Sequence, residues 1–222
     1  LNWTDMDQDG CEDVVEDEAA LEKNIKAKFR RNYRKARKHG LEIERFNNKD
    51  APVEELSKIL EATSKRKNFL TKTGNYLDRV WKELWKEGLV TLFVAKLDEK
   101  IEGVYLVTDN GVTAFEFYGG LTNSGRKHEA GYLLKIEMLK WAMEEGLRCF
   151  DFWGTAPYSE DGEYDKEHPL YTVSRFKQGF GGIKHTFPKQ HILVNNSEKY
   201  FLYKLLDKAR KAFISIRKMI PF

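Results

Sequence analysis

Apolar and polar positions follow a pattern that changes near residue 18. Residues 1–18 are acidic and polar and show no apolar period. From there to His39 the apolar residues recur at helical spacing, and Gly40 is a typical C-terminal stop. Residues 41–46, "LEIERF", alternate as a half-buried strand does. The pattern therefore predicts a helix and a strand after an acidic lead-in.

Two amphipathic helices are predicted next, at 53–67 and 76–87, the first opened by Pro52 and the second ended by Gly88. Three strand-like runs follow, joined by the short turns "DEK" and "DNG", which indicates an antiparallel meander. These runs are "LVTLFVAKL" (89–97), "EGVYLVTD" (102–109) and "VTAFEFYGG" (112–120).

The second half of the chain is predicted to alternate between helices and strands. A long helix spans 130–145 and is capped by Gly146. "LRCFDFWG" (147–154) is a short apolar run that we expect to be a central, buried strand. After a polar loop, we expect a short helix in "LYTVSRFKQGF" (170–180), a last strand in "HTFPKQHILVN" (185–195) and a basic helix from 198 to about 218.

Charge is segregated along the chain, although the net charge is only +3. Acidic residues dominate from Asp5 to Glu18, whereas the stretch from Lys23 to Lys38 is almost purely basic. Such a basic run is typical of a surface for nucleic acid or another polyanion. A solvated helix face that packs through its other side gives the same pattern. Both interpretations stay open at this point.

Cysteine usage and hydropathy point to a reducing compartment. The two cysteines, Cys11 and Cys149, lie far apart and lack metal-type spacing. No run approaches the roughly 18 apolar residues of a membrane span, and no signal peptide opens the sequence. We therefore expect a cytoplasmic protein. Because the chain begins with Leu1 rather than methionine, we also expect it to be a piece of a longer one.

The acidic lead-in contains one metal-type motif. Asp5, Asp7, Asp9 and Glu16 follow the spacing of the oxygen ligands in a calcium loop. Only four residues of this sequence precede the motif, too few for the expected entering helix, and Glu12 stands where an apolar residue would pin the loop. An acidic lead-in without calcium is the favoured interpretation, and no resident cofactor is expected.

The stretch "RFKQGFGG" (175–182) sets Lys177 behind an aromatic residue and ahead of a glycine-rich turn. It lacks the spaced glycines and following lysine of a phosphate-binding loop. Its glycines are therefore expected to end a helix and form a turn. Residue types alone favour an exposed Lys177 beside a core Phe176; a cation placed for chemistry is the alternative.

Four stretches, in this order, resemble the FemAB family, the aminoacyltransferases that build peptidoglycan interpeptide bridges. They are "RRNYRKARKHGLEI", "FYGGLTNSGRKHEAGYLLKIEMLKWAMEEG", "FDFWG" and "RFKQGFGG", and their order and spacing cover most of residues 21–218. The order of elements also looks like the GNAT superfamily. This implies an α/β (α+β) fold, with a mixed, mostly antiparallel sheet that is flanked by helices and splays open at its middle.

The resemblance also implies a domain arrangement. FemAB proteins usually carry two GNAT-like domains, and only the second is recognisable here. Residues 1–18 would then be the lead-in and 19–222 a GNAT-like aminoacyltransferase domain, with an N-terminal GNAT-like domain in the same parent protein.

The implied reaction moves an amino acid from aminoacyl-tRNA to the peptide stem of a peptidoglycan precursor, which is linked either to UDP or to a lipid. Lys177 would stabilise the negative charge of the tetrahedral intermediate, or bind a substrate carboxylate. The substrate-binding candidates are Phe176, Tyr118, Asp151, Gly154 and Arg126. The candidates for tRNA phosphate contact are Arg30, Arg34 and Arg37.

Several of these candidates have a structural alternative. Asp151 either binds substrate or braces the turn at Gly154, and Tyr118 either meets the precursor or packs at a strand end. The basic C-terminal helix either touches an anionic membrane or docks on its own domain.

Two rival functions remain. A GNAT acyltransferase that uses acyl-CoA needs a glycine-rich loop before its central helix, where backbone N–H groups cradle the pyrophosphate. In "RKHEAG" (126–131), Glu129 stands where glycine is needed, and its carboxylate would repel the pyrophosphate. The second rival is a non-catalytic module that binds tRNA or another polyanion.

Overall fold

The computed structural model describes residues 18–67, 71–72, 74–186 and 192–219. The calcium candidates lie outside these ranges: Asp5, Asp7, Asp9 and Glu16. Within the ranges, no three His, Cys, Asp or Glu side chains form a group that would hold a metal ion. The described helices include none whose length and apolar character would let it cross a bilayer.

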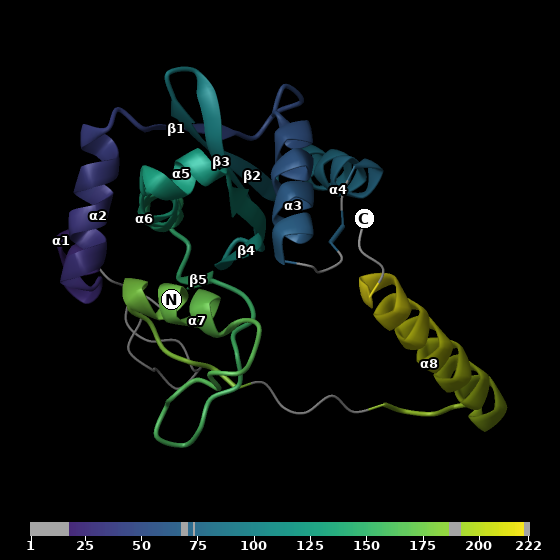
Figure 1. Cartoon of the computed structure of the whole chain (residues 1–222). Coiled ribbons are helices and arrows are strands. Elements are labelled where there is room, and N and C mark those ends of the chain that lie inside the picture. Colours follow the sequence, from purple (N-terminus) through teal and green to yellow (C-terminus); the bar gives the residue numbers. More distant parts are fainter. Residues whose placement is uncertain (1–17, 68–70, 73, 187–191, 220–222) are drawn as a thin grey trace.

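Five strands form one mixed sheet in the order β1-β2-β3-β4-β5 (Figure 1). The strands are β1 (Glu42–Phe46), β2 (Val90–Leu97), β3 (Lys100–Asp109), β4 (Thr113–Leu121) and β5 (Cys149–Asp151). Strands β1 to β4 are antiparallel to their neighbours, and β5 runs parallel to β4. The predicted antiparallel meander is therefore confirmed.

The expectation that β5 is a central strand is wrong, because β5 ends the strand order. Its Phe150 is nevertheless fully buried, since it packs into the apolar cluster on one face of the sheet. An apolar run of this length indicates burial, and burial here comes from helices rather than from flanking strands.

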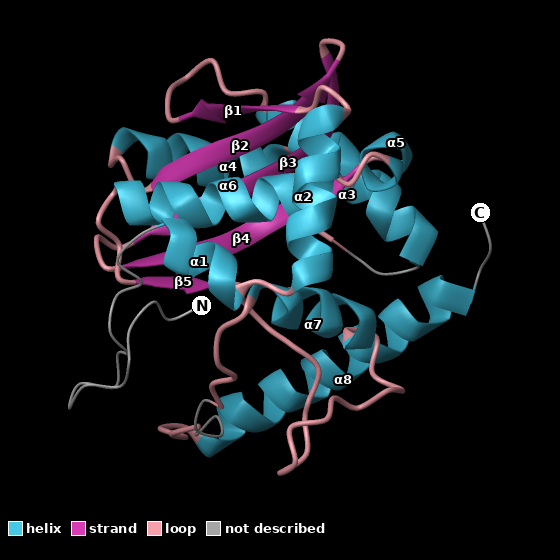
Figure 2. Cartoon of the chain, turned by 90° about the vertical axis from the view of Figure 1, so that its left-hand side faces the viewer, coloured by secondary structure: helices cyan, strands magenta, loops and turns pink. Residues whose placement is uncertain are grey.

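Helices cover both faces of the sheet (Figures 1 and 2). On one face lie α1 (Glu18–Asn24), α2 (Ala27–Lys38) and α6 (Ala130–Glu144), and on the other lie α3 (Val53–Lys67) and α4 (Asn75–Lys86). The remaining helices are α5 (Asn123–Lys127), α7 (Tyr171–Lys177) with the short 3-10 turn η1 (Gln178–Phe180), and α8 (Ser197–Met219). The predicted fold class, a mostly antiparallel sheet flanked by helices, is confirmed.

Alternation along the strands feeds two apolar cores. In β2, Phe93 enters the core beneath α2 and α6, while its neighbour Val94 enters the core beneath α3 and α4. The same alternation in β3 sends Tyr105 to the first core and Leu106 to the second. Side chains of successive strand residues point to opposite faces, so both faces of this sheet are buried.

The single helix predicted from residue 18 to His39 is interrupted between α1 and α2. Lys26 leaves the helical region with ψ of 138°. Its N–H donates to the carbonyl oxygen of Gly179, 3.0 Å away, rather than to a helical acceptor. The break therefore depends on a contact with a turn about 150 residues further along, which no local pattern reveals.

The last predicted strand, 185–195, does not form in the described part of that segment. Residues 185–186 and 192–195 have no strand pairing there, and 187–191 lie outside the described residues. The apolar Ile192 and Leu193 are exposed. Apolar residues alone do not make a strand, because its backbone also needs a partner.

Strands β4 and β5 pair over only three residues and then part. The pairing runs from Thr113 with Cys149 to Phe115 with Asp151. Strand β4 continues to Leu121 without β5 beside it, and a bulge at Phe117 disturbs its pairing with β3. Bulges often occur next to functional sites, where they redirect side chains. The sheet therefore parts directly after Phe115, between its last two strands and not at its middle, where the splay was predicted.

Gly179 attaches the α7–η1 segment closely to α2. A Cβ atom at this position would lie 2.0 Å from the ring of Phe29. We therefore expect Gly179→Ala to lower the free energy of unfolding by about 1–3 kcal/mol, because overpacking forces the ring and the turn apart. Urea denaturation measures this, with Gly154→Ala as the control, since a Cβ there meets nothing within 4 Å. Equal stability of the two variants would contradict the close approach.

Candidate functional site

Helix α7 holds Lys177 at the end of β5, where the sheet parts. The Nζ atom of Lys177 donates a hydrogen bond to the carbonyl oxygen of Gly154, at 2.9 Å. Fully buried Ser174 fixes the helix to the same loop, because its Oγ accepts the N–H of Ala156 at 2.7 Å. Two of the predicted site residues, Lys177 and Gly154, are thus in direct contact.

Phe176 faces away from the opening and anchors α7 in an aromatic cluster. Its ring centroid lies 5.7 Å from Phe29, 5.1 Å from Tyr132 and 5.1 Å from Phe180. The pairs with Tyr132 and Phe180 are edge-to-face, an arrangement that is favourable beyond the burial of the rings. Phe176 therefore positions its neighbour Lys177 through packing.

Asp151 braces the loop that faces Lys177. Its Oδ1 accepts the backbone N–H of Trp153 at 2.6 Å. Trp153 has φ of 66°, a left-handed conformation that is uncommon for a large side chain and often occurs at functional sites. Trp153 is 52% exposed, and its ring lies beside the rings of Phe115 and Phe117. The turn thus presents a large aromatic surface at the mouth of the opening.

The environment of Lys177 tunes its charge near neutral pH. Burial lowers the pKa of Lys177 from 10.5 to about 8, and the negative charge of Asp151 partly opposes this by raising it. A lysine with such a pKa remains mostly cationic at pH 7 and gives up its proton more readily than an exposed lysine. Asp151 therefore both shapes the loop and helps to keep Lys177 charged.

A buried ion pair that we did not predict from the sequence lies near Lys177, between α6 and β4. Lys135 of α6 is 1% exposed, and its Nζ contacts the carboxylate of Glu116 on β4. The ammonium also lies 4.1 Å from the ring centroid of Tyr105 and 5.2 Å from that of Phe152. Burial lowers the pKa of Lys135, and the charge of Lys177 lowers it further. Lys135 thus contacts both Glu116 on β4 and Phe152, the residue after β5, next to the point where the two strands part.

A signal for this pair exists in the sequence. Lys135 shares a helical face with Gly131, Leu134 and Met138, all of which are buried. A lysine in such a row must find a partner or lose its charge. Glu116 faces the same core, since its register partner Val107 belongs to it.

Tyr118 and Arg126 lie apart from the contacts of Lys177. Tyr118 belongs to the α3–α4 face of the sheet, beside Tyr76, and burial together with the Tyr76 hydroxyl raises its pKa to about 12. Arg126 on α5 donates to the carbonyl oxygen of Leu121 at 3.1 Å. Burial and the nearby charge of Arg66 lower the pKa of Arg126.

The three arginines of α2 differ in their availability for phosphate. Arg30 donates from Nη1 to the carbonyl oxygens of Glu22 and Ile25, at 2.7 and 2.5 Å, and so ties α1 to α2. Arg34 is 64% exposed and lies 4.0 Å from the carboxylate of Glu22. Arg37, near the end of the helix, is exposed. Arg34 and Arg37 thus remain accessible to a polyanion.

The segment before α6 differs from a pyrophosphate cradle. Residues 123–127 form α5, and Glu129 caps α6 with φ of 65°, a conformation that suits glycine. The carboxylate of Glu129 lies 3.4 Å from the Nζ of Lys35. The Glu129 carboxylate, paired with Lys35, therefore stands beside the helix N-terminus where a pyrophosphate would bind, and it makes no side-chain hydrogen bond to the N–H groups there.

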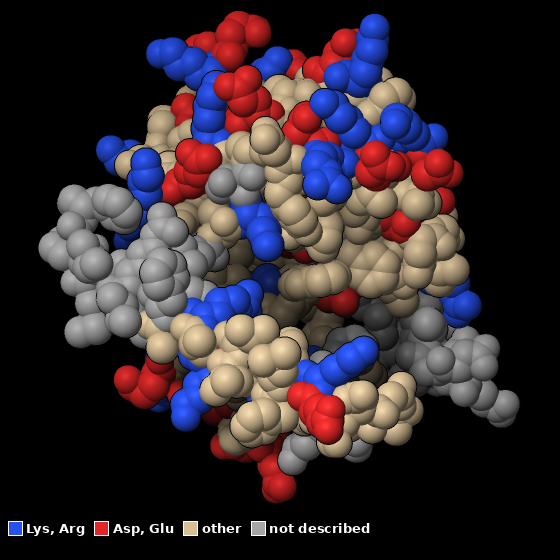
Figure 3. All heavy atoms as spheres, turned by 90° about the vertical axis from the view of Figure 1, so that its right-hand side faces the viewer, with Lys and Arg blue, Asp and Glu red and all other residues tan. Residues whose placement is uncertain are grey.

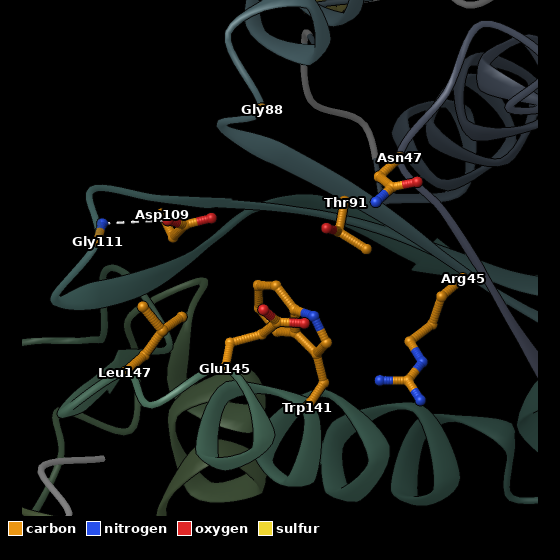
Figure 4. Close-up of a pocket in the computed structure, with 9 residues that line it drawn as sticks. All are labelled: Arg45, Asn47, Gly88, Thr91, Asp109, Gly111, Trp141, Glu145 and Leu147. Carbon is orange, nitrogen blue, oxygen red and sulfur yellow. Dashed lines mark hydrogen bonds between the residues drawn. The ribbon is translucent and has the colours of Figure 1, made fainter.

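A cavity of about 440 Å³ lies at the other end of α6 (Figure 4). Trp141 and Glu145 line it from the helix side, and Arg45, Thr91 and Asp109 line it from the sheet. Arg45 is already paired with Glu144, at 2.7 Å. None of the predicted site residues borders this cavity. The candidate site is instead the place where β4 and β5 part, because Lys177, Gly154 and Asp151 meet there.

Comparison with known families and sequences gives the following similarities. The family described as acetyltransferase (GNAT) domain matches residues 23–166. A lipid II:glycine glycyltransferase of Staphylococcus epidermidis is 24% identical over 155 residues, which are 67% of this chain and 36% of that protein. An aminoacyltransferase FemA of Staphylococcus epidermidis is 26% identical over 96 residues, 43% of this chain and 22% of that protein. The resemblance to the FemAB aminoacyltransferases is confirmed by these relatives.

Two solved structures share the fold. The crystal structure of FemX superposes with a TM-score of 0.66 and 18% identity, over 74% of this chain and 56% of that one. An aminoglycoside acetyltransferase from an uncultured soil metagenomic sample superposes with a TM-score of 0.50 and 17% identity, over 70% of this chain and 97% of that one. The chain spans about a third of the length of the glycyltransferase that it matches.

Proposed function

The chain belongs to the acetyltransferase (GNAT) domain family, and from this premise we propose that it acts as an aminoacyltransferase. It moves an amino acid from aminoacyl-tRNA to an amine on the peptide stem of a peptidoglycan precursor. The names of its relatives, a lipid II:glycine glycyltransferase and an aminoacyltransferase, support this substrate class. Its location is then the cytoplasm, where charged tRNA is found.

The observation that carries the proposal is the placement of Lys177. In the described part of the chain its ammonium makes one hydrogen bond, to Gly154, at the mouth of the opening between β4 and β5. An ammonium has three N–H donors. Two donors are thus available for an oxygen that becomes negative during the reaction. Preorganised donors of this kind contribute strongly to the stabilisation of the transition state.

The reaction is an aminolysis. The acceptor amine attacks the ester carbonyl of the aminoacyl-tRNA, and a C–N bond forms while the carbonyl oxygen becomes an oxyanion. Lys177 stabilises this oxyanion. The carbonyl then re-forms as the ester C–O bond breaks, and the proton that the amine loses is taken up by the leaving oxygen, which becomes the tRNA hydroxyl. Since the ester is already activated, orientation and charge stabilisation are the main requirements.

Glu129 favours this donor over acyl-CoA. Its carboxylate stands at the N-terminus of α6 and would repel a pyrophosphate there. The exposed Arg34 and Arg37 suit the phosphates of tRNA instead. We further propose that residues 19–222 work beside an N-terminal GNAT-like domain, because the chain corresponds to about a third of its glycyltransferase relative.

A product analysis tests the reaction. The chain, and in parallel the full-length parent protein, is incubated with aminoacyl-tRNA and a peptidoglycan precursor, either UDP-linked or lipid-linked. The expected result is a precursor whose mass has grown by one aminoacyl residue, with the new amide on the stem amine. Loss of the amino acid to water alone, with an unchanged precursor, would contradict the proposal.

The pKa of Lys177 sets the expected pH dependence. Because that pKa is about 8, the cation is present below pH 8 and is lost above it, so the transfer rate is expected to fall as the pH rises through this value. Asp151→Asn removes the charge that raises this pKa, and the fall should therefore move to lower pH. Rates measured from pH 6 to 10 in both proteins test this. A rate that stays constant to pH 10, or a fall that moves upward in Asp151→Asn, would contradict the role of the ammonium.

A further inference from the structure

Helix α8 exposes a row of large apolar side chains. It spans 23 residues, and Figure 1 shows it standing away from the sheet and the helices that cover it. Phe201 is 71% exposed, Leu202 55%, Leu205 55% and Leu206 60%. Of the two alternatives for this helix, docking on its own domain is therefore not supported by the exposure of these four side chains.

The exposed apolar residues form one continuous face. Positions 201, 202, 205 and 206 repeat at the spacing that stacks side chains on one side of an α-helix. Just before the helix, Ile192, Leu193 and Val194 are exposed as well. Monomeric soluble proteins rarely leave such contiguous apolar patches in water, so the face points to a docking surface.

Basic residues border this face on both sides. On a helix with 100° per residue, Lys204 and Lys208 lie next to Phe201, and Lys199 lies next to Leu206 on the opposite border. All three lysines are exposed. Over the whole helix the sequence holds seven Lys or Arg residues against two Asp or Glu residues. The occupant of the apolar face must therefore combine an apolar interior with a negatively charged rim.

We propose that α8 lies flat in the headgroup region of an anionic membrane. The face around Leu205 enters the acyl boundary, while Lys199, Lys204 and Lys208 extend their amines to lipid phosphates. An interfacial helix needs this arrangement of an apolar face between basic borders, and it need not span the bilayer. Docking of α8 does not depend on the aminoacyl transfer proposed above, and either can fail without the other.

The position of α8 fits this docking. Figure 3 shows the molecule from the side of α4 and α8, with a hollow between the body of the domain above and the α8 region below. Lys and Arg atoms lie at the rim of this hollow and within it. A membrane that holds α8 therefore lies close to this face of the protein.

Vesicle flotation tests the proposal. The chain is mixed with vesicles of phosphatidylcholine alone, or with vesicles in which phosphatidylglycerol replaces a third of it, at low and at high salt. Binding is expected with the anionic vesicles, and the bound fraction should fall at high salt because the lysine contacts are electrostatic. Equal binding to both vesicle types, or to neither, would overturn the proposal.

Variants of α8 test its apolar face and its basic borders separately. Leu205→Glu/Leu206→Glu is expected to lower the partition coefficient at least tenfold, and so is Lys204→Glu/Lys208→Glu. The matched control is Lys49→Glu/Lys86→Glu, which changes two exposed lysines elsewhere and should bind nearly as well as the unchanged chain. Full binding by the leucine variant would overturn the proposal. So would a dimer, detected by light scattering, that dissociates on the leucine change, because a second copy would then cover the face.

Discussion

Replacing Lys177 with alanine is expected to slow aminoacyl transfer by roughly 10²–10³-fold, the usual loss when one donor to a developing oxyanion is removed. The reason is the position of the ammonium, which is held at the end of β5 by its hydrogen bond to Gly154. The side chain is only half-buried and makes one hydrogen bond in the described part of the chain, so the fold should be retained. The loss should therefore appear in kcat rather than in protein stability.

A neighbouring cation provides the matched control. Arg175 lies two residues earlier on α7, is exposed, and donates to the hydroxyl of Tyr171 at 3.3 Å. Arg175→Ala removes the same formal charge from the same helix and should change the transfer rate less than threefold. Equal losses in the two variants would show that the net charge of α7, and not the placement of Lys177, matters.

Replacing Lys135 with methionine is expected to lower the free energy of unfolding by about 3–5 kcal/mol, because it leaves the carboxylate of Glu116 buried without its partner. The side chains of the pair are 2% and 12% exposed, so water gives the lone carboxylate little help. The substitution also removes the cation that lies over the face of the Tyr105 ring. Denaturant unfolding of the two proteins measures this difference in free energy, provided that both unfold with the same m-value.

The double variant Lys135→Met/Glu116→Leu tests whether stability depends on the charges of the pair or on the volume that its side chains fill. Replacing a buried ion pair by apolar side chains of similar volume is often neutral or stabilising. The double variant should thus recover most of the stability that Lys135→Met loses. The account is contradicted if the double variant is less stable than the single one, or if Lys135→Met lowers the free energy of unfolding by less than about 1 kcal/mol. The buried carboxylate of Glu116 would then not need the ammonium of Lys135 as its partner.

The elements predicted from the sequence are those whose signal is local. The amphipathic period and the terminal residues of α3, α4 and α6 lie within each helix, and these helices were predicted to within one residue. The errors have long-range causes. Helix α1 ends because Lys26 bonds to Gly179, and β5 is an edge strand because of how the whole sheet is ordered.

The candidate site was predictable where its residues are neighbours in a motif. Asp151, Gly154 and Lys177 come from two short stretches that resemble one family, and the structure brings them together through one hydrogen bond and one charge interaction. Lys135 lies on α6 and Glu116 on β4, and only the packing of this helix on this strand brings the two side chains together. A single lysine in an apolar helical row signals that a partner exists, but it does not say which strand supplies it.

The measurement that tests the central claim most directly is a competition between the two acyl donors. The protein receives a peptidoglycan precursor, aminoacyl-tRNA labelled with ³H and acetyl-CoA labelled with ¹⁴C, at equal concentrations in one tube. The expected result is ³H on the precursor, in large excess over ¹⁴C, with the ³H lost in Lys177→Ala. A product that carries mainly ¹⁴C would contradict the account, because the N-terminus of α6 would then accept the pyrophosphate that Glu129 is expected to repel.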